Sequence, residues 1–227
     1  MTRLGWAAGF GKLSRVRELC DWRTDVEVAD QEGRTPLWGA SCYGHLDVVR
    51  ELLARGANIE AAKNGGFTSL LIASQNGHLD VVRELLARGA NLEAVTNGGF
   101  TSLSVASENG HLAVVRELLA RGANIEAVTN GGFTSLHIAC FYGNLIIVRE
   151  LLARGANVNA VTNPDATPLI MASLSGHVEV VRALLAAGAD RHHVTNHGVT
   201  ATLLAGLNDS APPGSRAAVL ALLAAAP

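Results

Sequence analysis

The chain has 227 residues with a net charge of −2, and 48% of its residues are hydrophobic, 17% charged and 4% aromatic. This near-neutral balance gives no electrostatic reason to expect nucleic acid or an anionic membrane as a partner. No run of about 18 apolar residues occurs, so the sequence predicts no membrane-spanning helix. Three widely spaced cysteines favour buried thiols over a disulfide framework. We therefore expect an intracellular, cytoplasmic protein, with the nucleus left open.

A sequence unit of 33 residues recurs along the chain and organises the rest of it. Residues 64–73 read NGGFTSLLIA, residues 97–106 read NGGFTSLSVA and residues 130–139 read NGGFTSLHIA. Each is followed by a run such as HLDVVRELLARGAN, which has the apolar spacing of a helix. Such a unit cannot bury its apolar face alone, so copies must stack on one another around a continuous core.

The local signals within one unit predict its secondary structure. Thr68 is placed to cap a short first helix, and residues 79–86 carry apolar side chains at the three- and four-residue spacing of a second helix. Gly89 stands where a left-handed residue would end that second helix. Asn-Gly-Gly at 64–66 supplies the positive φ angles of a tight hairpin. The unit is therefore predicted to be a helix, a turn, a second helix and a hairpin finger.

The clearest copy of the unit runs from Gly33 to Ala61 and reads GRTPLWGASCYGHLDVVRELLARGANIEA. Its Thr-Pro-Leu, Gly-His-Leu, Val-Val, Leu-Leu and Gly-Ala-Asn segments resemble those of the ankyrin repeat family. The resemblance covers the chain from about Thr2 to Leu223. It implies an all-α dominated repeat solenoid, with a helix-turn-helix and a β-hairpin loop in each of about seven units.

The resemblance also implies a single ankyrin-repeat domain over residues 1–227. Its units lie near 2–34 (an N-terminal cap), 35–67, 68–100, 101–133, 134–166, 167–199 and 200–227 (a degenerate C-terminal cap). The terminal units deviate from the repeat because each has an outer face without a neighbour. Three middle units carry Ser69, Ser102 and Ser135 where the family has proline, which should slightly weaken the helix starts.

Aromatic residues indicate where a partner would bind. Phe67, Phe100 and Phe133 each follow Asn-Gly-Gly, so we expect one on each of three fingers. In the family, the fingers and the inner surface of the first helices form a concave recognition face. Aromatic side chains supply large contact area at low entropic cost. The expected partner-binding residues are Trp38, Tyr43, Phe67, Gln75, Asn76, Phe100, Glu108, Asn109, Phe133, His137, Phe141 and Tyr142.

The finger phenylalanines have a second interpretation, in which they pack on one another and hold adjacent repeats together. The charged residues point elsewhere: arginines and glutamates such as Arg50 and Glu84 recur in the second helices, where we expect a solvated outer face. The middle fingers offer only Lys63 as a charge, not the basic stripe that a nucleic-acid surface needs. Histidines such as His78 follow glycine at each junction and are expected to hydrogen-bond a neighbouring loop backbone.

Signatures of catalysis and metal binding are missing from the sequence. It contains no P-loop, no HExxH, no CxxC, no GxSxG and no GxGxxG opening a helix. Cys140 and His137 share one short predicted helix, but Cys140 occupies a packing position of the family, which argues against a catalytic dyad. The histidines of the finger at 191–197 lack cysteine or carboxylate companions, which favours an exposed polar finger over a metal site.

We therefore predict a non-catalytic protein–protein interaction scaffold that needs no cofactor or metal. The expected partner is another protein, neither nucleic acid nor membrane. We expect a monomer and leave end-to-end self-association open. Two alternatives remain: a targeting domain of a larger multidomain enzyme, and a self-assembling structural repeat protein.

Overall fold

The computed structural model describes residues 2–22, 25–207 and 214–225, which form fourteen helices and one two-stranded sheet. The helices are α1 (Arg3–Gly9), α2 (Leu13–Asp21), α3 (Pro36–Cys42), α4 (Leu46–Ala54), α5 (Ser69–Gln75), α6 (Leu79–Ala87), α7 (Ser102–Glu108), α8 (Leu112–Ala120), α9 (Ser135–Phe141), α10 (Leu145–Ala153), α11 (Pro168–Ser175), α12 (Val178–Ala186), α13 (Ala201–Leu207) and α14 (Ser215–Ala224). The strands are β1 (Ala62–Lys63) and β2 (Phe67–Thr68), which pair antiparallel. Part of the predicted C-terminal cap, residues 208–213, lies outside the described residues.

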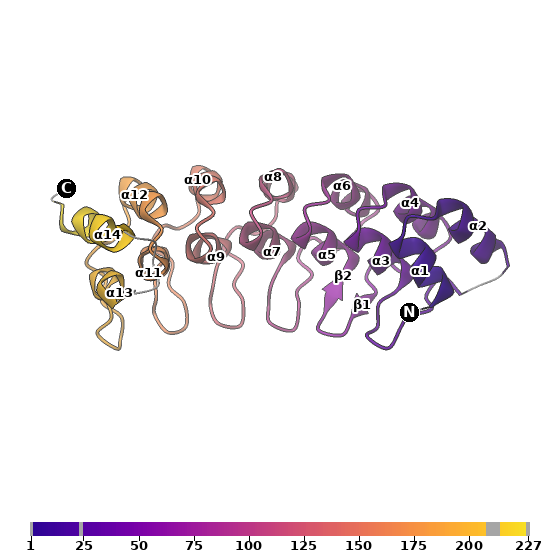
Figure 1. Cartoon of the computed structure of the whole chain (residues 1–227), viewed down its shortest axis with the longest axis horizontal. Helices are drawn as coiled ribbons and strands as arrows, with labels where there is room; N and C mark the ends of the chain where they lie inside the picture. The colour runs from indigo at the N-terminus through magenta and orange to yellow at the C-terminus, as the bar shows by residue number, and fades with distance from the viewer. Residues whose placement is uncertain (1, 23–24, 208–213, 226–227) are drawn as a thin grey trace. The chain divides into compact units, whose positions relative to one another are not determined.

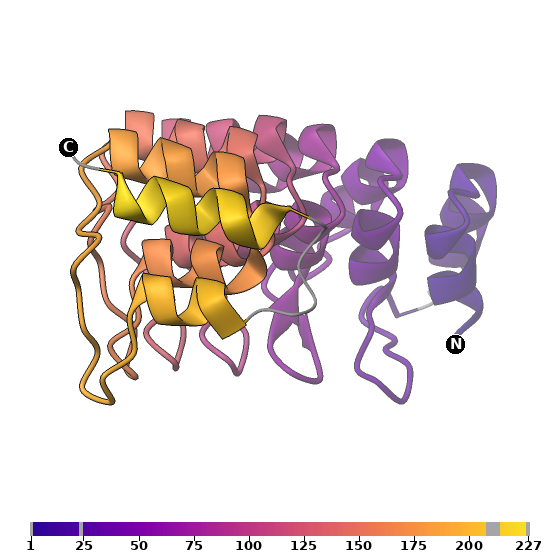
Figure 2. The same cartoon turned by 60° about the vertical axis from the view of Figure 1, so that its left-hand side comes forward.

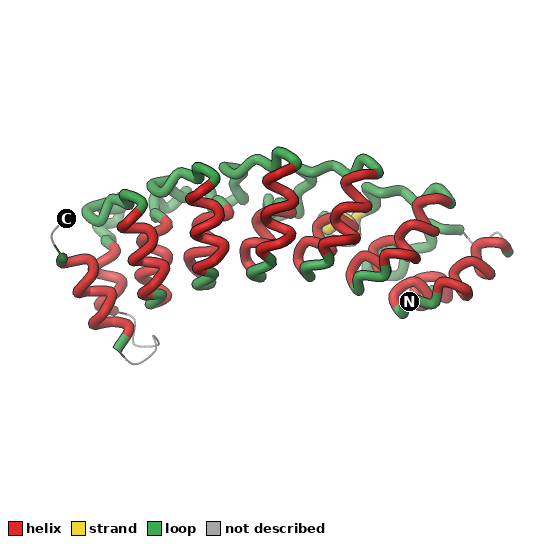
Figure 3. Tube along the Cα trace, turned by 90° about the horizontal axis from the view of Figure 1, so that it is seen from above, coloured by secondary structure: helices red, strands yellow, loops and turns green. Residues whose placement is uncertain are grey.

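The chain forms two compact units, Met1–Ala123 and Asn124–Pro227. In the first unit, α1, α3, α5 and α7 pack side by side in one layer, and α2, α4, α6 and α8 form the second layer (Figure 1). In the second unit, α13 lies beside α11 and α14 beside α12, as Figure 2 shows. Loops join the ends of the neighbouring helices in each unit (Figure 3). The predicted helix-turn-helix with a finger is confirmed, whereas one continuous domain stays a prediction.

A threonine starts each first helix, as the sequence predicts. The Thr68 hydroxyl accepts a hydrogen bond from the Leu71 N–H at 3.3 Å, which satisfies a donor that the first turn leaves unpaired. The next residue differs between repeats. Pro168 fills this position in α11, whereas the Ser102 hydroxyl in α7 is buried without a hydrogen-bond partner. Each finger therefore ends at a fixed, capped helix start.

Small aliphatic residues fill the core. In the second helices the Val-Val-x-x-Leu pattern is buried, as with Val81, Val82 and Leu85 of α6, which are at most 1% exposed. Leucines of the first helices, such as Leu70 and Leu103, complete the layer. Because this interior needs few aromatic side chains, most rings are left for the surface of the molecule.

Histidines at four junctions tie a repeat to the one before it, which confirms the expectation from the sequence. His78 Nε2 lies 3.0 Å from the Cys42 carbonyl oxygen. The His78 ring also lies against Gly44, where an added Cβ would come within 2.5 Å of Nδ1. Gly44 has a φ of +74°, so this position requires glycine for both its conformation and its contact. The same junction recurs at His45, His111 and His177.

The charged residues of the second helices form an ordered ladder instead of an independently solvated face. Glu84 accepts hydrogen bonds from Arg50 of the previous repeat at 2.9 Å and from Arg88 of its own repeat at 3.1 Å. The Glu84 side chain is only 14% exposed, although Arg50 is 52% exposed. The Arg50 hydrogen bond holds the pKa of Glu84 below its usual value. Equivalent bridges join Arg17 to Glu51 and Arg83 to Glu117.

Candidate protein-binding surface

Backbone hydrogen bonds hold neighbouring fingers together. The Asn97 N–H donates to the Gly65 carbonyl oxygen at 2.9 Å in the first unit. The Asn163 N–H donates to the Gly131 carbonyl oxygen at 3.0 Å in the second. The Asn-Gly-Gly motif thus supplies both the turn of one finger and the contact to the next. The fingers joined in this way are held by main-chain bonds as well as by any contact between rings.

The finger phenylalanines are half-buried, and each ring folds over a glycine of its own finger. A Cβ on Gly98 would lie 3.2 Å from the Phe100 ring, and one on Gly131 would lie 2.8 Å from the Phe133 ring. Phe67 and Phe100 make no ring–ring contact in the described part of the first unit. The mutual packing of rings considered from the sequence is therefore not observed for this pair.

The aromatic residues of the first helices divide into exposed rings and one buried ring. Tyr43 is 59% exposed in the first unit, and Phe141 and Tyr142 are 44% and 51% exposed in the second. Phe141 and Tyr142 contact each other edge to face, with 5.3 Å between ring centroids. Trp38 is only 8% exposed, and its Nε1 is buried without a hydrogen-bond partner. The rings of Tyr43, Phe141 and Tyr142 are therefore accessible to a partner, whereas the ring of Trp38 is nearly covered.

The four expected polar contacts lie at the ends of α5 and α7. Asn76 and Asn109 are exposed, and each amide is held by main chain: the Asn76 Nδ2 donates to the Cys42 carbonyl, and the Asn109 Nδ2 donates to the Val105 carbonyl, both at 2.8 Å. Gln75 and Glu108 are half-buried. These bonds hold the two exposed amides in fixed positions.

His137 has to be removed from the expected surface, because its side chain is fully buried. Its Nδ1 lies 2.8 Å from the Thr134 hydroxyl and its Nε2 lies 3.1 Å from the Ala166 carbonyl oxygen, which fixes the ring at the helix start. Burial lowers the pKa of His137 to about 4. The residue is thus a neutral structural cap. The sequence signal for its burial was that the equivalent positions of other repeats hold apolar residues, Leu71 and Ile170, which are also buried.

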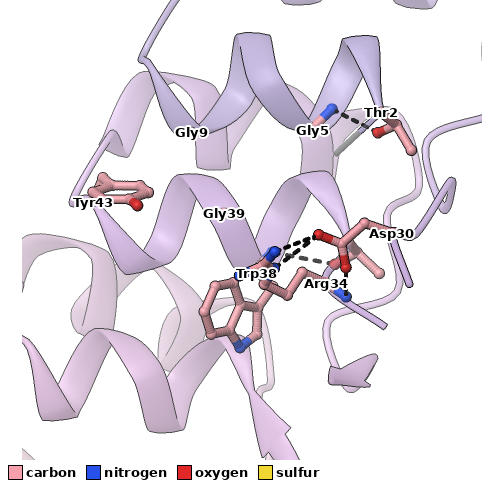
Figure 4. A pocket seen from close by; sticks show the side chains of 9 residues that line it. Thr2, Gly5, Gly9, Asp30, Arg34, Trp38, Gly39 and Tyr43 are labelled. Atoms are coloured by element: carbon pink, nitrogen blue, oxygen red, sulfur yellow. Dashed lines mark hydrogen bonds and ion pairs between the residues drawn. The ribbon is translucent and has the colours of Figure 1, made fainter. Parts of the chain in front are cut away.

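A small pocket of about 40 Å³ lies between α1 and α3 of the first unit (Figure 4). It exists because Gly5 and Gly9 of α1 meet Gly39 of α3, so no side chain fills the space between the helices. The Asp30 carboxylate and the Arg34 guanidinium, 2.8 Å apart, close one side, and Trp38 closes another (Figure 4). This volume suits a few waters or the tip of one small side chain, well short of a pocket for a whole small-molecule ligand.

Two features of this surface were not predicted from the sequence. Lys63 places its Nζ over two aromatic rings, 5.3 Å from the centroid of Trp38 and 5.8 Å from that of Phe67. The sequence signal was available, since Lys63 is the one cation in a row of finger residues that otherwise holds Asp30 and threonines. Trp6 and Phe10 of the first repeat are also exposed and lie 5.0 Å apart, centroid to centroid.

Cys140 and His137, the pair considered from the sequence as a catalytic dyad, are both buried. Cys140 is fully buried, and burial raises the pKa of its thiol, so the thiolate needed for nucleophilic attack is disfavoured. Its neighbour His137 is equally inaccessible. Within residues 2–22, 25–207 and 214–225, no three metal-ligating side chains lie close enough together to share an ion. In the same ranges, no helix has the length and apolar character to cross a membrane.

Comparisons with known proteins identify a family and solved structures that are similar to this chain. A family model described as ankyrin repeats (3 copies) matches residues 4–96, 70–162 and 147–226. The crystal structure of the human ASB11 ankyrin repeat domain has a TM-score of 0.88 and 27% identity to this chain, and the match covers 100% of both chains. The ankyrin repeat domain of Bcl-3, described as a unique member of the IkappaB protein family, has a TM-score of 0.79, 30% identity and 98% coverage of both chains. A search of curated protein sequences gave no match.

Proposed function

The chain belongs to the ankyrin-repeat family, whose domains are generally protein–protein interaction modules, and we propose that it is a non-catalytic scaffold that binds a partner protein. The proposed binding surface consists of the fingers and the exposed ends of the first helices. It includes eleven of the expected residues, with His137 left out. Trp38 would add little contact area of its own, because its ring is nearly covered.

The observation that carries this proposal is the exposure of large rings on helices whose positions are fixed. Tyr43, Phe141 and Tyr142 each expose more than two-fifths of their surface at the ends of α3 and α9. Exposed aromatic side chains have a free-energy cost in water that contact with a partner relieves. Aromatic rings are also enriched among the residues that contribute most to protein binding.

The proposed mechanism is contact on a preformed surface. Main-chain hydrogen bonds join neighbouring fingers at Asn97 and at Asn163, and the amides of Asn76 and Asn109 are held by carbonyl groups. A surface that is already ordered loses little conformational entropy when a partner binds. The binding energy then comes from apolar burial of the rings, while the fixed polar groups contribute selectivity.

Alanine substitutions matched for lost apolar area test this proposal. Phe141→Ala and Tyr142→Ala remove exposed rings from the end of α9, whereas Ile146→Ala removes a side chain that is 63% exposed on α10. Partners captured by the wild-type chain are identified by quantitative mass spectrometry, and their recovery is compared between variants. We expect the ring variants to lose at least about tenfold of a specific partner. Equal loss with Ile146→Ala would place the binding surface on the second helices instead.

Self-association is a second candidate function, which exposed apolar residues of the terminal repeats favour. Trp6 of α1 and Phe10 at its C-terminal end are 47% and 58% exposed, and Leu203 and Leu207 of α13 are 47% and 66% exposed. Apolar side chains at the ends of a repeat array would allow end-to-end contact between copies. Sedimentation velocity across a hundredfold range of concentration tests this, since a monomer keeps one sedimentation coefficient throughout.

A further inference from the structure

The residue at one position of the finger makes the same hydrogen bond in most repeats, but Lys63 at this position cannot make it. In the finger of Thr96, the threonine hydroxyl accepts a hydrogen bond from the Phe100 N–H at 3.1 Å. The same bond to the residue four positions later is made by Asp30, Thr129, Thr162 and Thr195. Lys63 occupies the equivalent position, and its ammonium group has no lone pair to accept such a bond. The finger of Lys63 therefore lacks a side-chain-to-backbone hydrogen bond that every other described finger contains.

Among the described residues, Lys63 contacts aromatic rings and forms no ion pair. No carboxylate lies within ion-pairing distance of its Nζ, whereas the nearby Arg34 pairs with Asp30 at 2.8 Å. The Nζ instead stands over the rings of Trp38 and Phe67. A single cation above aromatic faces is stabilised by the rings and keeps its remaining donors available.

Lys63 combines its charge with apolar contact area. Burial raises the pKa of the Cys42 thiol, whereas the Asn76 hydrogen bond and the charges of Lys63 and Arg34 act in the opposite direction. Apolar contact area lies directly beside the charge, because the half-buried Phe67 ring and the Trp38 ring border it. Trp38 also forms a wall of the small pocket between α1 and α3 (Figure 4).

We infer that Lys63, above the rings of Trp38 and Phe67, binds the carboxylate of an aspartate or glutamate in an extended segment of the partner protein. This inference rests on the proposed function, because it names the chemistry that the finger surface recognises. A carboxylate is favoured over a phosphate group because one lysine supplies a single positive charge, whereas phosphorylated segments are typically bound by clusters of arginine. The 40 Å³ pocket beside Trp38 would accept a small apolar side chain next to the acidic residue.

The repeat itself provides a substitution that separates binding from folding. Lys63→Thr restores the hydroxyl found in the fingers of Thr96 and Thr129, so it should keep or raise the melting temperature while it removes the charge. Lys63→Arg keeps the charge and should keep the preference for acidic segments. A lysine that served only the fold would give the opposite result, with Lys63→Thr lowering the melting temperature.

A random dodecapeptide display library, selected on the immobilised full chain, is the probe for the test. We expect the selected peptides to share an acidic residue beside a small apolar one. Replacing that acid with its amide, or Lys63 with threonine, should weaken binding about fivefold at low salt, with a smaller effect at high salt. Fluorescence anisotropy with labelled peptide measures both changes.

Three other results would overturn the inference. Peptides that bind the wild-type chain and need the finger phenylalanines but show no acidic preference would leave the proposed function standing and remove the role of Lys63. An acidic preference that persists in Lys63→Thr would do the same. A chain that selects no peptide at all would contradict the proposed function as well.

Discussion

The N–H of Asn163 donates to the Gly131 carbonyl oxygen at 3.0 Å, and the same nitrogen lies 2.6 Å from where a Cβ on Gly132 would stand. The two fingers are thus in direct main-chain contact at a residue that has no side chain. This contact explains why Asn-Gly-Gly recurs at the same place in the repeat. Glycines with positive φ therefore fall into two kinds: those that also touch a neighbouring finger, such as Gly132, and those that have open space around them, such as Gly155.

Gly132→Ala should therefore destabilise the protein more than Gly155→Ala. Both glycines have positive φ, +78° and +87°, but nothing lies within 4 Å of a Cβ built on Gly155. We expect Gly155→Ala to cost about 1 kcal/mol from backbone strain alone. Gly132→Ala should cost about 2–4 kcal/mol, because the finger contact must also open. Urea denaturation measures both, and equal midpoints would show that the fingers do not pack as described.

Ser102→Pro should stabilise the protein by about 1 kcal/mol. The Ser102 hydroxyl is buried without a partner, and Thr101 before it already has the extended conformation that precedes proline. Pro36 and Pro168 occupy the same position in two other repeats. Ser102→Ala removes the hydroxyl without fixing φ, so its gain should be smaller. Calorimetry ranks the three proteins, and a lower melting temperature for the proline variant would contradict this account of the helix start.

Ala183→Glu should extend the ladder of charges on the second helices. Arg149 has no carboxylate within ion-pairing distance among the described residues, and the following repeat carries Ala183 where earlier repeats carry the bridging glutamate. We expect a gain of about 0.5 kcal/mol, which high salt reduces. Ala183→Gln is the matched control, because it has similar size and no charge. If both variants have the same stability in low salt, the ladder does not extend to this junction.

His137 should make stability fall as the pH is lowered from about 6.5 to about 4. Burial depresses its folded-state pKa from 6.5 to about 4, so in this range the unfolded chain binds a proton that the folded chain does not. The stability that neutral His137 contributes is fully present above pH 6.5, and up to on the order of 3 kcal/mol is lost by pH 4. His137→Leu, which matches Leu71 in another repeat, should flatten this part of the profile. Urea unfolding at stepped pH measures the slope, and an unchanged slope in the variant would assign it to other groups.

The sequence was sufficient to predict the family, the repeat-solenoid fold class and the local signals within a unit, and these predictions are confirmed. The reason is physical: Thr68 and Gly89 act on neighbouring backbone, so their effect depends on residues a few positions away. The junction histidines were also predictable, because one contact recurs with the period of the repeat.

The proposed binding surface was less predictable, because the exposure of its residues depends on contacts between repeats. Tyr43 and His137 were both predicted to lie on the binding surface, yet one is exposed and the other is buried. The bridging position of Glu84 depends on an arginine 34 residues earlier, which a pattern within one helix does not reveal. Lys63 stands out only when its finger is compared with the others that carry a hydrogen-bonded threonine.

Site-specific photo-crosslinking measures directly which side of the chain a partner touches. p-Benzoylphenylalanine is placed at Tyr43, at Phe141 or at Ile146, all of which are exposed, and the full chain is irradiated in lysate of the cells that express it. We predict that the positions of Tyr43 and Phe141 yield the same cross-linked protein, with contacts mapped by mass spectrometry, and that the position of Ile146 does not. A cross-link to that protein from Ile146, with none from the other two positions, would show that binding occurs on the second helices and contradict the proposed surface.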